Sequence, residues 1–150
     1  MGSFIVNFQV KTDAVEPLKA ELREVIPGRA YVPPPRDGWV AVYEESTSWQ
    51  DHEAICRIGQ TLSERLDTHL VAFLVHDSDV LRYWLYERGE LLDGYTSHPD
   101  YFGQHVDESA REQCQGRPGV LARYCLRGTT EDAIREVLQG DVRSGVFADD

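Results

Sequence analysis

The chain has 150 residues, and 15 Lys and Arg against 26 Asp and Glu give it a formal net charge of −11 with its five His neutral. That length is typical of one domain and allows roughly two thirds of the unfolded surface to be buried. A strongly acidic surface repels phosphate backbones, so nucleic acid is a poor candidate partner and a basic protein a better one. The three cysteines, Cys56, Cys114 and Cys125, are odd in number and form no CxxC pair. This favours a reducing compartment over a disulfide framework.

The N-terminal apolar stretch, around Phe4 to Val6, is too short for a signal peptide or a membrane span. Val6 also stands where a myristoylation signal requires Ser or Thr. We therefore expect a soluble, cytoplasmic protein with no membrane partner.

The first half of the chain predicts two strand and helix pairs. Apolar residues alternate over 4–10, which is typical of a half-buried strand, and a helical stripe including Leu18 and Leu22 follows an Asp13 cap. Residues 29–38 contain Pro33 to Pro35 and predict an extended connector. A strand over 39–43 and a second helix, opened by Ser48 with Asp51, come next. The core stripe of that helix is Ile55, Ile58, Leu62 and Leu66.

Residues 71–103 form the central stretch of the chain. Residues 71–75 are apolar at every position, which predicts a strand covered on both faces. A turn over 76–79, a strand over 80–87, a tight turn at Gly89 and a strand over 91–95 then predict an antiparallel meander.

The rest of the chain has a weaker pattern. We expect a loop over 104–119, a short helix within 120–126, and a last helix capped by Thr129 with Asp132 and stopped by Gly140. The element order β-α-β-α-β-β-β predicts one sandwich-like α+β domain over 1–150, with a mixed or antiparallel sheet and two helices packed on one face. Within it, 1–103 would hold the sheet and both helices, and 104–150 the loop and C-terminal helices.

The first candidate site is an interaction surface on the strand over 80–87. Arg82, Trp84 and Tyr86 alternate onto one face of that strand, and Arg88 follows in the turn. We place this face opposite the two helices, where the C-terminal helices either cover it or leave it open to a partner. Core packing is the alternative explanation for Trp84 and Tyr86.

The second candidate site is a cluster of histidines and carboxylates, namely His76, Asp77, Asp79, His98 and Asp100. These side chains would bind a divalent metal or act as an acid–base pair if the first turn and the end of the third strand meet. Ordinary turn chemistry is the alternative explanation of Asp77 and Asp79. His52 with Cys56 lacks the second histidine of a zinc helix, Cys114 lacks a sequence-adjacent base, and no GxSxG, P-loop or GxGxxG motif occurs.

The segment HDSDVLRYWLYERGELLDGYTSHPDYF, residues 76–102, resembles a family of bacterial proteins without an assigned function. The likeness covers the middle third of the chain well, the second helix moderately and the rest loosely. The resemblance implies the fold and a bacterial setting, and it implies no reaction. Members of that family continue from a Phe-Ala-acidic segment into a further helix, so the end of this chain at 146–150 implies a truncated chain or a short member.

Two functions of different classes follow. The first is a non-enzymatic acidic binding module, of an immunity or regulatory type, that docks a basic protein through the face of Arg82, Trp84 and Tyr86. It would act as a monomer or homodimer and would need no cofactor. The alternative is a small metal- or acid–base-dependent hydrolase, or a ligand-binding protein, that uses the His/Asp cluster.

Overall fold

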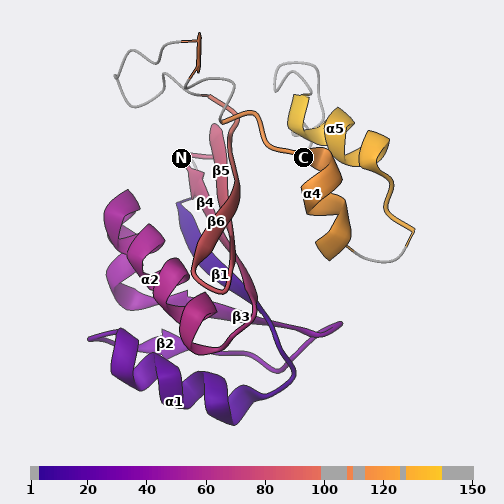
Figure 1. The fold of residues 1–150 in the computed structure, drawn as a ribbon. Helices are drawn as coiled ribbons and strands as arrows, with labels where there is room; N and C mark the ends of the chain where they lie inside the picture. The colour runs from indigo at the N-terminus through magenta and orange to yellow at the C-terminus, as the bar shows by residue number, and fades with distance from the viewer. Residues whose placement is uncertain (1–3, 99–107, 110–113, 126–127, 140–150) are drawn as a thin grey trace. The chain divides into compact units, whose positions relative to one another are not determined.

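The computed structural model describes residues 4–98, 108–109, 114–125 and 128–139. It confirms the α+β class, because an antiparallel sheet carries packed helices (Figure 1). Two compact units, Met1–Leu92 and Asp93–Asp150, make up the chain, and the boundary between them falls within the last strand of the sheet. The prediction of one domain, with the sheet and two helices in 1–103 and the C-terminal helices in 104–150, stays a prediction.

The sheet has six strands in the order β2-β3-β1-β4-β5-β6. Their bounds are β1 Ile5–Lys11, β2 Ala30–Tyr31, β3 Trp39–Glu44, β4 His69–His76, β5 Val80–Glu87 and β6 Glu90–Thr96. Five of them match the predicted strands. Strand β2 was not predicted, because two residues are too few to show an alternation and they precede three prolines.

Two helices, α1 (Val15–Val25) and α2 (His52–Arg65), lie on the same face of the sheet, as Figure 1 shows. Alternation along the strands then directs every second side chain toward them. Their buried residues and those of the strands form one apolar core. It contains Leu18 and Leu22 of α1, Ile55, Ile58 and Leu62 of α2, and Phe8, Val40, Leu70, Leu74, Trp84 and Tyr86 of the sheet. The predicted helical stripes are confirmed, except that Leu66 is only partly buried.

The helix starts differ from the predicted caps. Helix α1 follows Ala14 and has no side-chain cap, so the predicted Asp13 cap is absent. Instead, the Thr12 hydroxyl accepts a hydrogen bond from the Ala14 N–H at 3.0 Å. Residues Glu45–Trp49 form a 3-10 helix, η1, so α2 starts later than Ser48 and is capped by Asp51, which accepts from the Glu53 N–H at 3.1 Å.

Tight turns join strands β4, β5 and β6 into the predicted meander, with residues 77–79 between β4 and β5 and residues 88–89 between β5 and β6. Asp77 and Ser78 have φ of +52° and +56°, and Arg88 and Gly89 have φ of +48° and +89°. Positive φ at both central residues matches the right-handed twist of the flanking strands. The side chains of the His76 to Asp79 segment therefore belong to a tight hairpin turn.

Strand β2 is an exposed sheet edge of only two residues. It pairs with β3 through Ala30 opposite Glu44 and Tyr31 opposite Tyr43. Pro33 to Pro35 follow closely and have no N–H to donate. This edge therefore cannot be extended far by another strand, which limits unwanted edge pairing.

The second unit holds α4 (Pro118–Leu121), the 3-10 helix η2 (Ala122–Tyr124) and α5 (Glu131–Gln139). The Tyr95 hydroxyl donates to the Leu138 carbonyl at 2.8 Å, and the buried Asp93 carboxylate accepts from the Arg117 N–H at 3.0 Å. Helix α5 confirms the last predicted helix. Its start is tied by Thr130, which accepts from the Ala133 N–H at 3.1 Å, rather than by Thr129.

Candidate functional site

The predicted aromatic interface on β5 is wrong, because Trp84 and Tyr86 lie under α2. Their exposed fractions are only 6% and 5%. The register places Trp84 opposite Ala72 and Tyr86 opposite Leu70, and all four side chains belong to the helix-covered core. The alternation along β5 was predicted correctly, but it cannot tell which of the two faces the helices cover.

The two arginines of that predicted interface have separate surroundings. The Arg82 guanidinium lies 4.8 Å from the Trp84 ring centre, and its Nη1 is 3.4 Å from His52 Nδ1. Arg88 is exposed in the β5–β6 turn, where its Nε lies 3.1 Å from Asp67 Oδ1. Arg82 therefore stabilises the packing around Trp84 by a cation–π contact, and Arg88 forms a surface ion pair.

The predicted His/Asp cluster does not form a metal site in the part of the chain that the structure describes. His76 Nδ1 lies 2.6 Å from the Gln50 amide oxygen, while Asp77 and Asp79 belong to the hairpin turn. His98 belongs to the second unit, and Asp100 lies outside the described residues. No described group of three or more His, Cys, Asp or Glu residues is arranged to hold a metal ion.

A different cluster of exposed aromatic residues lies at one end of the sheet in the first unit. Five of the seven large hydrophobic side chains that are exposed among the described residues lie just before β1, at its start, in β2, near the end of β3 or in η1. They are Phe4, Ile5, Tyr31, Tyr43 and Trp49. Antiparallel pairing of β1 with β3 and of β3 with β2 brings the strand ends together.

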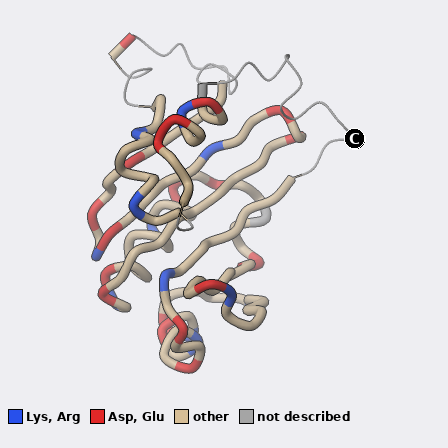
Figure 2. The backbone as a smooth tube through the Cα atoms, turned by 90° about the vertical axis from the view of Figure 1, so that its right-hand side faces the viewer, with Lys and Arg blue, Asp and Glu red and all other residues tan. Residues whose placement is uncertain are grey.

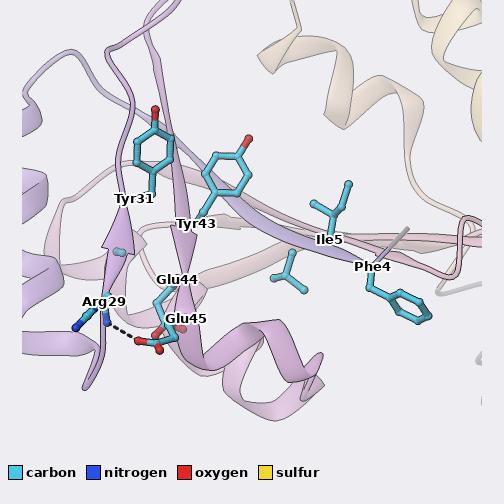
Figure 3. Close-up of a pocket in the computed structure, with 9 residues that line it drawn as sticks. Phe4, Ile5, Arg29, Tyr31, Tyr43, Glu44 and Glu45 are labelled. Carbon is cyan, nitrogen blue, oxygen red and sulfur yellow. Dashed lines mark hydrogen bonds between the residues drawn. The ribbon is translucent and has the colours of Figure 1, made fainter. Parts of the chain in front are cut away.

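An open hollow of about 630 Å³, here called the tyrosine pocket, lies among these strand ends. The Tyr31 and Tyr43 rings stand side by side, with centres 6.2 Å apart and planes tilted by 35°. Figure 3 shows both rings on the same side of the strands as Ile5, with their hydroxyls directed away from the backbone. The lining residues are Phe4, Ile5, Val6, Arg29, Ala30, Tyr31, Tyr43, Glu44 and Glu45.

The two glutamates of the tyrosine pocket have different roles. Glu44 is buried, and its carboxylate accepts from the N–H groups of Ser46 at 2.9 Å and Thr47 at 3.0 Å, so it caps η1. Glu45 is exposed and accepts from the Arg29 N–H at 3.3 Å, the contact drawn in Figure 3. Glu45 lines the same hollow, but Figure 3 shows its side chain next to Arg29, on the opposite side of the strands from the two tyrosine rings.

This arrangement can attract a cation. Aromatic ring faces and carboxylates both attract an ammonium or guanidinium group. The hollow offers both kinds of group, so its lining favours the binding of a cation.

Sequence reasoning missed the tyrosine pocket, although part of the signal was present. Val40 and Val42 lie on the core face of β3, so Tyr43 had to lie on the opposite face. The position of Tyr31 beside Tyr43 depends on the two-residue pairing of β2, for which the sequence has no pattern. Only the structure places the two rings together.

Comparison with known proteins adds no homologue. No family model matches the chain, and no match was found among curated proteins or solved structures. Within the described residues, no helix has the length and apolar character needed to span a membrane.

Proposed function

We propose that this protein is a non-enzymatic acidic binding module, of an immunity or regulatory type, that docks a basic protein partner at the tyrosine pocket. The observation that carries the proposal is the exposed pair Tyr31 and Tyr43, which are 67% and 42% exposed and line one hollow together with Glu45. Tyrosine is enriched at protein interfaces because it combines a large contact area with a polar group and few rotatable bonds.

The charge of the chain supports a basic partner. The net charge is −11, and Figure 2 shows acidic residues spread over turns, strand ends and helices. Such a surface accelerates the approach of a positively charged protein, while the rings and Glu45 give it a defined contact point. Arg29 also lines the hollow and contacts Glu45, so it opposes this attraction locally, and the partner's cation would approach from the side of Tyr31 and Tyr43.

The alternative hydrolase has no comparable support. Its His/Asp cluster includes Asp100, which lies outside the described residues, and its described members do not form a metal-binding group. The tyrosine pocket therefore remains the better candidate site.

A titration with a hexa-arginine peptide, followed by NMR of the labelled protein at low and moderate salt, tests the proposal. We expect the largest shifts at Tyr43, Glu45 and their neighbours. Tyr43→Ala should weaken binding at least fivefold, and Glu45→Gln should weaken it about two- to threefold with a smaller salt dependence. The control Leu91→Ala also removes an exposed apolar side chain and should change little.

Shifts spread evenly over the acidic surface, with Tyr43→Ala and Leu91→Ala binding equally well, would contradict the proposal. Glu45→Gln keeps an acceptor for the Arg29 N–H, so its effect reports the charge rather than the local fold. A hexaglutamate peptide should cause no comparable shifts, which excludes general peptide stickiness.

A further inference from the structure

A second hollow, here called the cationic groove, lies within the first unit between α1 and the edge strand β2. Its volume is about 300 Å³. Its walls come from one side of α1, from the segment after that helix and from β2. The lining residues are Lys19, Leu22, Arg23, Ile26, Gly28, Ala30, Tyr31 and Val32.

The groove holds two cations and no carboxylate, although the whole chain has an acidic excess. Lys19 and Arg23 are four residues apart on α1, so they lie on one face of the helix and repel each other. Among the described residues, Arg23 has no hydrogen-bond or ion-pair partner on its side chain. The nearest partner of Lys19 is Glu16, at a long 3.9 Å between Nζ and Oε1. Both charges are therefore available to an anion.

The floor of the groove is apolar. Leu22 and Ile26 are buried core residues of α1 and its end, and Val32 packs partly buried against the same core. The largely exposed Tyr31 ring forms the wall on the side of β2. A bound molecule would therefore contact apolar atoms, an aromatic ring and two cations.

We infer that the cationic groove binds a small amphiphilic anion, an aromatic or aliphatic carboxylate or sulfonate. Its head group pairs with Lys19 and Arg23, and its apolar part lies over Leu22 and Ile26 against Tyr31. A pocket that combines an apolar lining with a few charged groups is the usual form of a small-molecule site. The groove shares Ala30 and Tyr31 with the tyrosine pocket, but this inference does not rest on the proposed function, because Lys19 and Arg23 belong to the groove alone and favour an anion.

A matched pair of probes tests the inference: 4-phenylbutyrate and 4-phenylbutylamine, which share a ring and chain and differ in charge. Each is titrated into the labelled full chain and followed by NMR. Phenylbutyrate should shift the resonances of Leu22, Ile26 and Tyr31 with a Kd on the order of 1 mM, which is ordinary for a ligand of this size. Phenylbutylamine should not shift Leu22 and Ile26.

The variant Arg23→Glu should weaken phenylbutyrate binding at least fivefold. Arg57→Glu is the matched control, because it makes the same charge change at an exposed position of α2 and should leave the affinity within about twofold. Tyr43→Ala should also leave it unchanged, which separates this groove from the tyrosine pocket. Equal losses in Arg23→Glu and Arg57→Glu, or equal shifts of Leu22 and Ile26 by both probes, would overturn the inference.

Discussion

Two aromatic pairs lie on opposite faces of the same sheet and have opposite environments. Trp84 and Tyr86 are almost completely buried under α2, whereas Tyr31 and Tyr43 are exposed. The residue types are similar, so the difference comes from the cover that a helix provides on one face. An aromatic strand residue therefore indicates a core or a binding surface only once the covered face is known.

The covered pair is held by close contacts with α2. A Cβ on Gly59 would lie only 3.1 Å from the Tyr86 ring, so the absence of a side chain at this position lets the helix approach the strand. Burial raises the pKa of the Tyr86 hydroxyl, and its hydrogen bond with Cys56 raises it further. The His52 ring also lies 5.6 Å from the Trp84 ring. These contacts should make the pair under α2 sensitive to changes that the exposed pair Tyr31 and Tyr43 tolerates.

The sharpest contrast should come from truncating one ring on each face. Trp84→Ala should lower the free energy of unfolding by about 3 to 5 kcal/mol, because it leaves a large cavity under α2. Tyr43→Ala should lower it by only about 1 kcal/mol or less, since 42% of the Tyr43 surface is already exposed. Urea unfolding of both variants measures the difference. Similar losses in the two variants would mean that the two faces do not differ as described.

The contact of Gly59 with Tyr86 should give a smaller effect. Gly59→Ala gains up to about 1 kcal/mol of helix propensity, but overpacking against a buried ring costs about 1 to 3 kcal/mol. We expect a net loss of about 1 kcal/mol in urea unfolding. In the double variant with Tyr86→Leu, the added methyl has room and the loss should shrink. Strictly additive effects would contradict the contact.

The fold could be predicted largely because local patterns determine it. Alternation in β1 and β5 and the helical stripe around Ile55 and Ile58 identified the main elements and the α+β class. Each of these patterns is set by whether a side chain faces the core, which the sequence records directly.

The candidate site could not be predicted in the same way. Helix α2 covers one face of β5, and long-range packing decides which face that is. The alternation of Trp84 and Tyr86 shows only that they share a face, so it does not tell whether they are buried or exposed. The tyrosine pocket needs the pairing of the two-residue strand β2 with β3, which has no sequence signature. The cationic groove likewise depends on the placement of α1 beside that strand.

The smallest expected effect is a pH dependence on the covered face. Burial lowers the pKa of His52 from its ordinary value of 6.5, and the charges of Arg82 and His76 lower it further, while Asp51 opposes them. Well above pH 6.5 neither the folded nor the unfolded state protonates His52, so its titration has no effect on stability. As the pH falls from 6.5 toward the lower pKa of the folded state, the unfolded state takes up the proton first and stability decreases.

Urea unfolding at pH 7.5 and pH 5.5 measures this effect. The stability lost between the two pH values should be smaller in His52→Gln than in the unchanged protein. His98→Gln, at an exposed histidine of the second unit, is the control and should leave the loss unchanged. Carboxylates also titrate in this range and contribute to the loss in every protein. The effect of His52 is therefore the difference in loss between His52→Gln and the unchanged protein. An equal loss in His52→Gln and the unchanged protein would show that the surroundings of Trp84 do not hold His52 neutral.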